Sequence, residues 1–454
     1  MSNLPILPID SGRYGTKEMR QIFEEENRLQ KMLDVEAALS WALEERGLLP
    51  TEDARRISEM ASTKFVKLDR VKEIENKIQH DVMAVVEALA EVCGESGALI
   101  HYGATSNDIN DTATALQFKD AFNVLRGRIR TLIRTLIGLV ERHRSTIMIG
   151  RTHGQHALPI TLGLKLSVWM MELTRHLERL EQCSQRMIVG KITGAVGTQA
   201  GFGPYGLEIQ SLVMKKLGLR SVEVSTQIVQ RDRYAEGICV LAMLASSLEK
   251  FATEVRELQR TEIGELAEPF DVKSQVGSST MPHKTNPMTC ERICGLAKLV
   301  RGLVIPALEN IPNWQERDLT QSSAERFILP SAFILVDYMT ALMNKVLSGL
   351  VVNPERMAQN MGITQGRFMS ESIMLALTKK GMARQSAHQL VRDLSLRSIE
   401  MNVPLKEVLL SEKRVIELFS PREMDALLNP KNYLGTTHEQ VEGALRKARE
   451  YVGE

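Results

Sequence analysis

Apolar residues recur every three or four positions along most of this chain, and such spacing is typical of α-helices. The clearest case is the stripe formed by Leu125, Ile129, Leu132, Leu136 and Val140, in a stretch without proline between residues 111 and 148. Side chains at this spacing lie on one face of a helix and can pack against other helices. The pattern therefore predicts a long amphipathic helix in this part of the chain.

Four further segments show the same period, and compact loops rich in glycine and proline separate them. They are residues 161–188, 230–266, 290–310 and 323–350. Long helices joined in this way predict an elongated bundle. Strand-like alternation is scarce, and Val222–Val224 is the best short candidate.

Breaks in the pattern on either side of the bundle divide the chain. Residues 1–110 hold shorter helical stretches, and the part after Pro354 and Gly362 has the pattern of a smaller helical unit. We therefore predict an all-α fold of three helical domains: residues 1–110, a central long-helix bundle at residues 111–353, and residues 354–454. A length of 454 residues fits this division, because it exceeds what one simple core can hold.

The composition argues against several classes of protein. A net charge of +1 gives no broad basic field that would attract nucleic acid or an acidic membrane surface. The longest uncharged apolar run, residues 238–248, is far shorter than the roughly 20 residues of a membrane helix, and the N-terminus lacks the basic and apolar regions of a signal peptide. The five cysteines include no C-x-x-C pair. This favours a reducing compartment, the cytoplasm, and argues against a disulfide framework or a metal site.

One loop, Gly277 to Pro287, has a composition that neither a core nor a regular helix requires. It combines the hydroxyl groups of Ser278 and Ser279 with the cation of Lys284, between glycine and two prolines. Backbone N–H groups, hydroxyls and a cation together suit a carboxylate or an oxyanion. An ordinary polar surface loop is the alternative interpretation.

Further polar clusters lie near the ends of the predicted helices, at residues 79–81, 101–108, 150–156, 226–233 and 314–326. Each also has a structural interpretation, such as a polar turn, a helix cap, structural histidines or a solvated ion-pair face. The last cluster holds Arg317 and Arg326 with two serines between them at the start of a helix. It suits a phosphate group as well as it suits a salt-bridged helix cap.

These motifs together resemble a known family. The loop at residues 277–287, followed by Glu291, is similar to the signature Gly-Ser-Ser-x-Met-Pro-x-Lys-x-Asn-Pro of the fumarase/aspartase superfamily, with every fixed position matched. The other clusters narrow the resemblance to the adenylosuccinate lyases. The matching segments are residues 12–14, 77–81, 101–113, 150–154, 225–233 and 314–326. The likeness weakens over the last hundred residues, and Gln79 and Arg292 stand where the family often has Arg and Asn.

The resemblance implies a β-elimination that releases fumarate from adenylosuccinate, and from a succinyl-carboxamide ribotide of purine synthesis, without a cofactor. It implies that Ser278 is the base, that His153 is the acid, and that Glu291 orients His153. Lys284 and Asn286 would hold the succinyl carboxylates and the charge that develops. Further substrate-binding candidates are, for the succinyl group, Thr105, Ser106, Ser279 and Gln227; for the phosphate, Arg13, Tyr14, Arg317, Ser322 and Arg326; and for the base and ribose region, His80 and Asp81. His101 is a further substrate-binding candidate.

The length of the first predicted helix has a consequence of its own. His101–Asp108 and His153 flank about 38 residues, which would span roughly 55 Å as a continuous helix. Groups at its two ends cannot reach one small substrate within one chain. The active site would then be shared between subunits, in line with the homotetramer of packed helical bundles that the resemblance implies. A strong kink at Gly127 or Gly138 would undermine this prediction.

Three alternatives compete with this interpretation. Other superfamily lyases, such as argininosuccinate lyase, fumarase or aspartase, have no need of the phosphate-binding cluster at residues 314–326, and neither has a carboxymuconate cycloisomerase. A structural protein on a lyase scaffold would be free to lose its catalytic groups, yet Ser278, His153, Lys284 and Glu291 are all present. A nucleic-acid-binding role lacks a basic patch.

Overall fold

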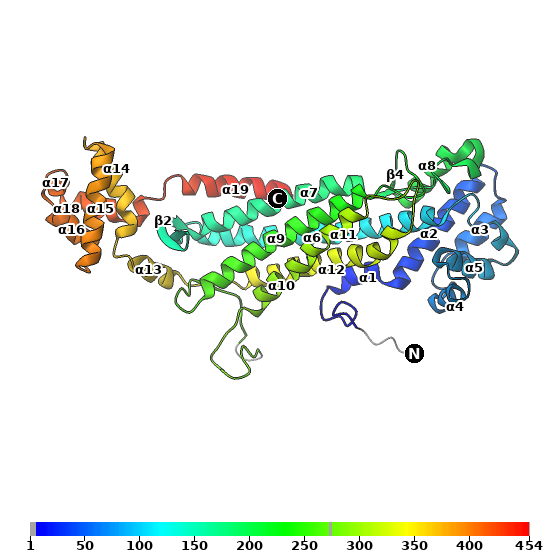
Figure 1. The fold of residues 1–454 in the computed structure, drawn as a ribbon, viewed down its shortest axis with the longest axis horizontal. Coiled ribbons are helices and arrows are strands. Elements are labelled where there is room, and N and C mark those ends of the chain that lie inside the picture. Colours follow the sequence, from blue (N-terminus) through cyan, green and yellow to red (C-terminus); the bar gives the residue numbers. More distant parts are fainter. Residues whose placement is uncertain (1–5, 272–274, 454) are drawn as a thin grey trace. The chain divides into compact units, whose positions relative to one another are not determined.

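The computed structural model describes residues 6–271 and 275–453, and helices dominate both ranges (Figure 1). Within these ranges strands form only three two-stranded sheets. The predicted all-α fold is confirmed. The first five residues, which belong to the N-terminus that lacks a signal-peptide pattern, lie outside the described residues.

The long helices agree with the apolar stripes that predict them. They are α6 Ser106–His143, α7 Leu162–Met187, α9 Asp232–Gln259, α10 Met288–Gly302 and α12 Thr320–Ser348. The predicted helix at residues 290–310 is divided, because α11 Val304–Glu309 follows α10 as a separate helix. Pro306 accounts for this break, since its ring lacks an N–H for the carbonyl of Gly302 and crowds that carbonyl. Helix α6 runs without interruption through Gly127 and Gly138.

The chain forms two compact units, and each contains part of the long helices. The first unit consists of Met1–Ile129, Arg175–Glu249 and Ile293–Leu342, and the second of Arg130–Thr174, Lys250–Arg292 and Met343–Glu454. The predicted division into three domains remains a prediction.

Short helices in the first unit build a core around α2. They are α1 Lys17–Phe23, α2 Glu25–Glu44, α3 Thr51–Met60, α4 Leu68–Ile78, α5 Asp81–Cys93, a 3-10 turn at Gly94–Leu99, a second at Ala200–Tyr205 and α8 Gly206–Leu217. Helix α8 packs on α2 although more than 160 residues separate them in the sequence (Figure 1). Leu33, Leu39 and Leu89 are fully buried in this core. Strands β3 Val189–Gly190 and β4 Arg220–Ser221 pair beside it.

An aromatic cluster joins three of the long helices within the same unit. Phe333 of α12 lies with its ring centroid 5.6 Å from that of Phe118 and 5.2 Å from that of Phe122, both on α6. Tyr234 of α9 packs edge-on against Phe118 at 5.1 Å. Offset and edge-on contacts of this kind are favourable beyond the apolar area they bury.

The second unit contains a β-hairpin and a C-terminal group of helices. The hairpin is formed by β1 Ile147–Thr152 and β2 Gln155–Thr161, and β5 Leu266–Ala267 pairs with β6 Val351–Val352. The C-terminal helices are α13 Pro354–Gly362, α14 Ser370–Lys379, α15 Arg384–Glu400, α16 Leu405–Ser411, α17 Lys413–Ile416, α18 Pro421–Leu428 and α19 Thr437–Val452, with 3-10 turns at Arg367–Met369 and Pro430–Asn432. Helices α14, α15, α16 and α18 share a core of their own, whereas α19 is bound to α6, whose Arg134 donates to the Val452 carbonyl at 2.8 Å.

Two local predictions about strands were wrong. Residues Val222–Val224 do not form a strand: β4 ends at Ser221, and Val224 is 81% exposed. The hairpin at residues 147–161 is absent from the sequence prediction, which places only a polar cluster at residues 150–156 there. Its turn holds histidine rather than asparagine, so the usual hairpin signal is weak.

Helix α12 is the one described helix whose length and composition would suit a membrane span, and 61% of its most apolar window is buried inside the chain. An apolar helix in the core of a protein is also expected to be buried in this way.

Replacing Phe333 with alanine tests the aromatic cluster. We expect Phe333→Ala to lower the free energy of unfolding by about 3–5 kcal/mol, because it leaves a cavity between α6 and α12. Urea-induced unfolding followed by circular dichroism would measure the change. Phe65→Ala is the matched control, since Phe65 is 48% exposed. Equal losses in the two variants would contradict the assigned packing.

Candidate active site

A cavity of about 370 Å³ in the first unit collects residues from α2, α4, α5, α6 and α12. Several predicted substrate-binding residues line it, namely Asp81, Arg317, Ser322 and Arg326. Polar residues to which the sequence analysis gave no role also line it, namely Arg28, Asn107, Asp111, Arg231 and Glu325. The wall is therefore rich in guanidinium groups, which suit a phosphate or a carboxylate.

Arg231 forms the buried floor of this polar group. Its guanidinium donates to both oxygens of Asp111 at 2.9 Å, and its Nε donates to Glu325 at 2.7 Å. Arg231 is 4% exposed, so the interpretation of residues 226–233 as a solvated ion-pair face is wrong at this position. Arg233 keeps that role, because it pairs with the exposed Glu223 at 2.7 Å. Charges that are buried together in this way need their partners, since an unpaired one is costly.

Two other arginines of the cavity have polar but uncharged partners. Arg28 donates to the side-chain oxygen of Asn110 at 2.9 Å, and Arg317 donates to that of Gln227 at 2.8 Å. In the part of the chain that the structure describes, neither forms a salt bridge with a carboxylate. Burial lowers the pKa of both guanidinium groups, although nearby acidic residues oppose this effect. A bound anion would therefore compensate two cations that have lost hydration.

Arg317 has a second amide against it. When the Asn107 amide is oriented to satisfy both groups, its oxygen accepts from the Nη1 of Arg317 at 2.8 Å. Asn107 belongs to the first turn of α6, and Gln227 to the segment before α9. Two separate parts of the chain thus fix the direction of one guanidinium.

The predicted ribose and base residues lie beside the same cavity. Arg326 and Asp81 form an ion pair at 2.8 Å. His80 caps α5 by accepting from the backbone N–H of Met83, and its Nε2 lies 3.4 Å from the Ser106 hydroxyl. The structure therefore brings together His80, Asp81, Ser106 and Arg326, while Thr105 is the residue just before α6.

Three of the predicted binding residues outside the cavity lining, Arg13, Tyr14 and His101, have other partners. Arg13 is exposed, with its guanidinium 6.0 Å from the ring centroid of Tyr14, and that ring lies 6.0 Å from Tyr338. His101 turns instead toward α2, where its Nδ1 lies 2.7 Å from the fully buried Glu36 carboxylate. Burial opposes protonation of His101, but Glu36 outweighs this effect and raises the pKa of the imidazole. Substrate contacts for these three remain predictions.

His153 occupies the tip of the hairpin in the second unit. Because Thr152 pairs with Gln155, His153 and Gly154 form a two-residue turn, with φ angles of 54° and 73°. Two positive φ angles are the mark of a type I′ turn, which asparagine and glycine usually supply. A histidine in this backbone conformation is uncommon and points to a role for its exposed imidazole.

The hairpin that carries His153 is fixed at its base. Arg151 forms a two-pronged salt bridge with Glu265, at 2.9 and 2.6 Å, and Glu265 is fully buried. Asn360 of α13 donates to the same carboxylate at 2.7 Å. A bidentate pair backed by a third partner holds the strands rigidly beneath the turn.

The Ser278 loop folds back on itself. The Ser278 hydroxyl oxygen accepts from the backbone N–H groups of Thr280 at 3.3 Å and Met281 at 3.0 Å, and Asn286 donates to the Gly277 carbonyl at 2.8 Å. Donors aimed at this oxygen favour negative charge on it. A side chain at Gly277 would collide with the carbonyl of Lys284, because an added Cβ would lie 2.0 Å from that oxygen. Glycine is thus required for the fold of the loop.

The remaining predicted catalytic residues are exposed in the second unit. Glu291 lies in the first turn of α10, and Ser279 and Lys284 lie on the surface of the loop. No hydrogen bond or ion pair joins His153 to Glu291 among the described residues. The backbone of α10 is capped instead by Glu268, which accepts from Thr289 at 3.0 Å and Cys290 at 2.9 Å.

The two positions that depart from the family pattern have plain structural settings. Gln79 ends α4 in a left-handed conformation, with a φ angle of 55°. Arg292 is exposed on α10. A left-handed helix end requires a residue that tolerates positive φ, which accounts for Gln79 without a ligand.

Sequence comparison assigns most of the chain to known families. Residues 12–302 match a family described as lyase, and residues 366–444 match one described as the adenylosuccinate lyase C-terminus. An adenylosuccinate lyase of Pyrococcus abyssi is 51% identical over 98% of this chain and 99% of its own. One of Bacillus subtilis is 41% identical over 91% of this chain and 94% of its own.

Solved structures share the fold. A fumarate lyase from Mesorhizobium sp. BNC1 superposes with a TM-score of 0.90 and 32% identity, over 97% of this chain and 100% of that one. A 3-carboxy-cis,cis-muconate lactonizing enzyme from Pseudomonas putida also gives 0.90, with 31% identity over 98% of this chain and 100% of its own. Identity to the adenylosuccinate lyases is higher than to either structure.

The pair of His101 and Glu36 predicts a pH dependence of stability. A histidine whose pKa is raised by folding adds stability that is complete below its unfolded pKa, about 6.5, and that is lost as the pH rises through its folded pKa. We expect the difference in free energy of unfolding between the native protein and His101→Asn to be larger near pH 6 than near pH 9. Asparagine tolerates the positive φ of 65° at this position. A difference that grows with pH would contradict the assigned ion pair.

Proposed function

The chain belongs to the adenylosuccinate lyase family of the fumarase/aspartase superfamily, and we propose that its cavity in the first unit binds the nucleotide part of the substrate. As a member of this family it is a carbon–nitrogen lyase. It eliminates fumarate from adenylosuccinate to leave AMP, and from succinyl-aminoimidazole-carboxamide ribotide to leave the carboxamide ribotide of purine biosynthesis. The relatives named adenylosuccinate lyase, at 41–51% identity over nearly the full chain, favour this activity over the sister lyases.

One observation carries the assignment of the cavity. Arg28 and Arg317 are partly buried and form no salt bridge with a carboxylate among the described residues, and Arg326 and Ser322 lie in the same wall. A nucleotide phosphate would supply the missing negative charge. A sister lyase whose substrate has no phosphate has no need of so many guanidinium groups in one wall.

The reaction needs a base, an acid and a site for developing negative charge. Ser278 would remove the proton from the carbon beside the succinyl carboxylate. The two backbone N–H groups that already point at its oxygen would stabilise the alkoxide form. Lys284 and Asn286 would bind the carboxylate toward which the carbanion charge moves. These assignments follow the family motif residue by residue.

His153 would donate the proton to the departing nitrogen, so that AMP leaves with a neutral amino group. Its position at the tip of a braced hairpin suits a residue that must reach a substrate held elsewhere. Glu291 would orient the imidazole across a subunit boundary, since no contact joins the two within the described part of this chain. A carboxylate that fixes the orientation of an imidazole is a common arrangement in acid–base catalysis.

The length of α6 supports sharing of the site between subunits. Its 38 residues give a helix of about 57 Å, with Thr105 and Ser106 at one end and the hairpin of His153 after the other. Side chains from both ends can act on one substrate only if different chains supply them. The family's oligomers allow this, and a homotetramer of packed bundles is the assembly proposed here.

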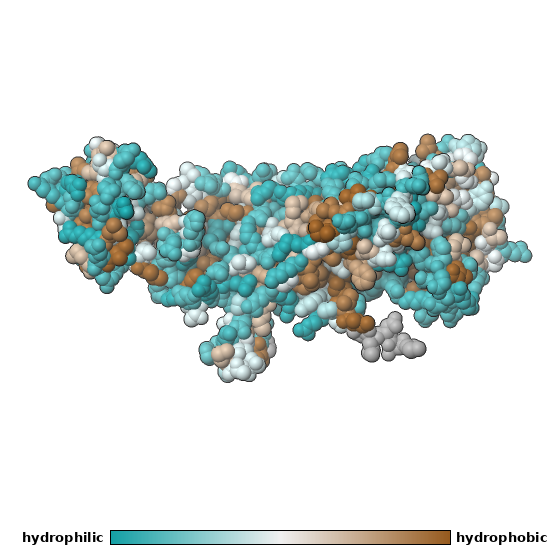
Figure 2. Space-filling view, in the orientation of Figure 1, coloured by the Kyte–Doolittle hydropathy of each residue, from teal (hydrophilic) through white to brown (hydrophobic). Residues whose placement is uncertain are grey.

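Exposed apolar side chains on the long helices support the same assembly. They include Val168 of α7 at 54%, Leu299 of α10 at 58%, Ile305 of α11 at 64% and Phe327 of α12 at 66% exposure. Figure 2 shows hydrophobic patches over the region of α11 and α12. Apolar surface of this kind is normally covered by another protein, and a second copy of the same chain is the occupant that symmetry favours.

Two broader assignments accompany this function. None of the five cysteines forms a disulfide in the described part of the chain, and four of them are buried, which supports a reducing compartment and hence the cytoplasm. Separate cores around α2 and around α14 and α15 support an N-terminal and a C-terminal domain that precede and follow the bundle in the sequence.

Loss of the acid and the base should abolish turnover. We expect Ser278→Ala and His153→Ala each to lower kcat for adenylosuccinate by about 10²–10⁴-fold. The ultraviolet absorbance of the substituted purine, together with fumarate release, would measure this. Ser386→Ala and His438→Ala are matched controls on exposed C-terminal helices. Activity in either catalytic variant comparable to its control would refute the assigned role, and an inactive native protein would redirect the assay to argininosuccinate.

Mixing two inactive variants tests the shared site. Inactive Ser278→Ala and inactive His153→Ala subunits should regain fumarate release after they are unfolded together and refolded, because some sites then combine an intact serine with an intact histidine. Sedimentation would establish the size of the assembly. Activity in a monomeric fraction, or no recovery in properly assembled mixtures, would argue that one chain supplies the whole site.

A further inference from the structure

The direction of Arg317 in the cavity depends on two amide oxygens, those of Asn107 and Gln227. Gln227 is itself anchored, because its amide nitrogen donates to the Ala195 carbonyl at 2.9 Å. Its backbone N–H also donates to the Glu316 carbonyl at 3.3 Å, next to Arg317. The position of the Arg317 guanidinium therefore depends on two other segments, the start of α6 and the loop at residues 193–195.

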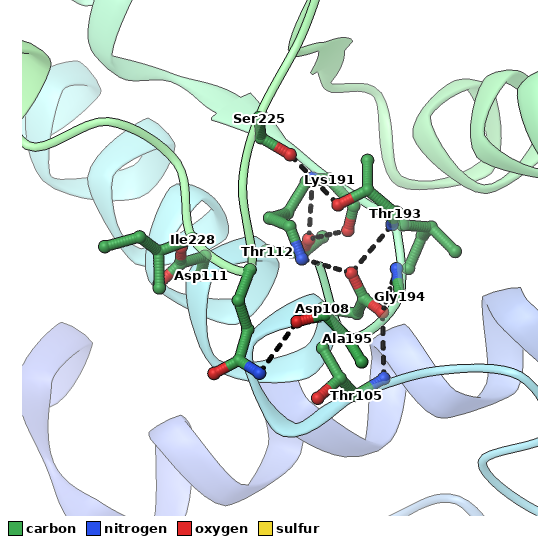
Figure 3. A network of polar contacts seen from close by, with 12 residues as sticks. Thr105, Asp108, Asp111, Thr112, Lys191, Thr193, Gly194, Ala195, Ser225 and Ile228 are labelled. Atoms are coloured by element: carbon green, nitrogen blue, oxygen red, sulfur yellow. Dashed lines mark hydrogen bonds and ion pairs between the residues drawn. The ribbon is translucent and has the colours of Figure 1, made fainter. Parts of the chain in front are cut away.

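Both of these segments are attached to one buried carboxylate, that of Asp108 (Figure 3). Its Oδ2 accepts from the backbone N–H groups of Thr105 at 2.9 Å and Gly194 at 3.0 Å. Its Oδ1 accepts from the backbone N–H of Thr193 at 2.8 Å. One side chain thus joins the N-terminal end of α6 to a loop 85 residues further along.

Lys191 makes this arrangement possible by neutralising the carboxylate. Its ammonium group forms an ion pair with the Oδ1 of Asp108, and both side chains are completely buried. The backbone of Lys191 is held in place by Thr112, whose hydroxyl donates to the Lys191 carbonyl at 2.9 Å and lies 3.1 Å from its N–H. A carboxylate buried with N–H donors but without a cation would be far less stable.

The loop continues this connection toward Gln227. The hydroxyl groups of Thr193 and Ser225 lie 2.9 Å apart, as Figure 3 shows. Gly197 packs so closely against the segment that an added Cβ would lie 2.2 Å from the Ser225 carbonyl. The segment that carries Gln227 is therefore in close contact with the loop that Asp108 holds, and it is hydrogen-bonded to that loop.

We propose that Asp108 and Lys191 are positioning residues for substrate binding, which act through Asn107, Gln227 and the guanidinium of Arg317. Neither lines the cavity or touches its contents. This inference rests on the proposed function, in that Arg317 is taken to bind the substrate phosphate. It assigns to a buried ion pair, which does not contact the substrate, an effect on the affinity of the site for that substrate.

The substitution Asp108→Asn preserves the shape of the side chain but replaces one carboxylate oxygen, which accepts hydrogen bonds, with an NH₂ group, which donates them. An amide NH₂ would then face backbone N–H donors or the Lys191 ammonium, so the loop and the start of α6 would separate. We expect the KM for adenylosuccinate to rise by about tenfold or more, while kcat changes by less than about threefold, because the catalytic groups are untouched. Lys191→Met should shift KM in the same direction.

A double-mutant cycle separates positioning from general loss of stability. If Asp108 acts through Arg317, Asp108→Asn should lower kcat/KM by less than about twofold in an Arg317→Ala background, against about tenfold or more in the native one. Equal losses in the two backgrounds would overturn the proposal. The control is Thr340→Val, which removes a buried hydroxyl that bonds within α12. It should leave KM unchanged.

Two additions keep the test decisive. Thr193→Val removes the hydroxyl contacts of Thr193 with Ser225 and with the Thr226 carbonyl. It should fold even where Asp108→Asn does not, with a smaller rise in KM. An unchanged KM in a folded Thr193→Val protein would count against the loop as the connection. Calorimetric binding of AMP to the native and Asp108→Asn proteins needs no turnover. If the native protein releases no fumarate, the proposed function fails, whereas equal AMP affinity in both proteins overturns the positioning role.

Discussion

Buried carboxylates in the first turns of α6 organise the first unit of this chain around its cavity. Asp108 holds the Lys191 ammonium and three backbone N–H groups, and Asp111 holds the Arg231 guanidinium and the backbone N–H of Val229. Both lie near the N-terminal end of a long helix, where the helix dipole favours negative charge. Segments from three distant parts of the sequence therefore converge on one helix end, and the cavity lies where they meet.

Two of the predicted site residues lie on backbone that is uncommon for their residue type. His153 and His101 have positive φ angles, a conformation that costs free energy for residues other than glycine. In each case neighbouring contacts hold the residue there: the Arg151–Glu265 pair braces the hairpin of His153, and Glu36 binds His101. The strain is thus localised at exposed tips and helix boundaries, while the long helices beneath them remain regular.

The long helices also determine the distance between the functional groups at their two ends. A helix of the length of α6 separates the groups at its ends by far more than the size of a nucleotide, which is the basis of the proposal that the site is shared between chains. The same helices leave large apolar side chains exposed, including Phe327 and Ile305. Covering this surface with another copy and completing the active site would then be one event, which couples assembly to activity.

The sequence by itself determined the helical fold and the reaction class. A period of three and four apolar positions leaves little choice but helices, and the boundaries of α6 and α7 differ from the predicted ones by a few residues. The resemblance of the Ser278 loop and of the cluster from Arg317 to Arg326 to a known family indicated a lyase and predicted a phosphate-binding site. Local signals of this kind survive in sequence because they depend on neighbours along the chain.

Only the tertiary structure decided which polar residues are buried and with whom they pair. Asp108 and Lys191 are 83 residues apart, and Arg231 and Glu325 are 94 apart, so nothing local marks them as partners. The hairpin of His153 was missed for a similar reason, because its stability comes from Glu265 and Asn360, more than a hundred residues further along. Periodicity reports the face that a helix buries, whereas the choice of a buried ion's partner depends on contacts that form only when the chain folds.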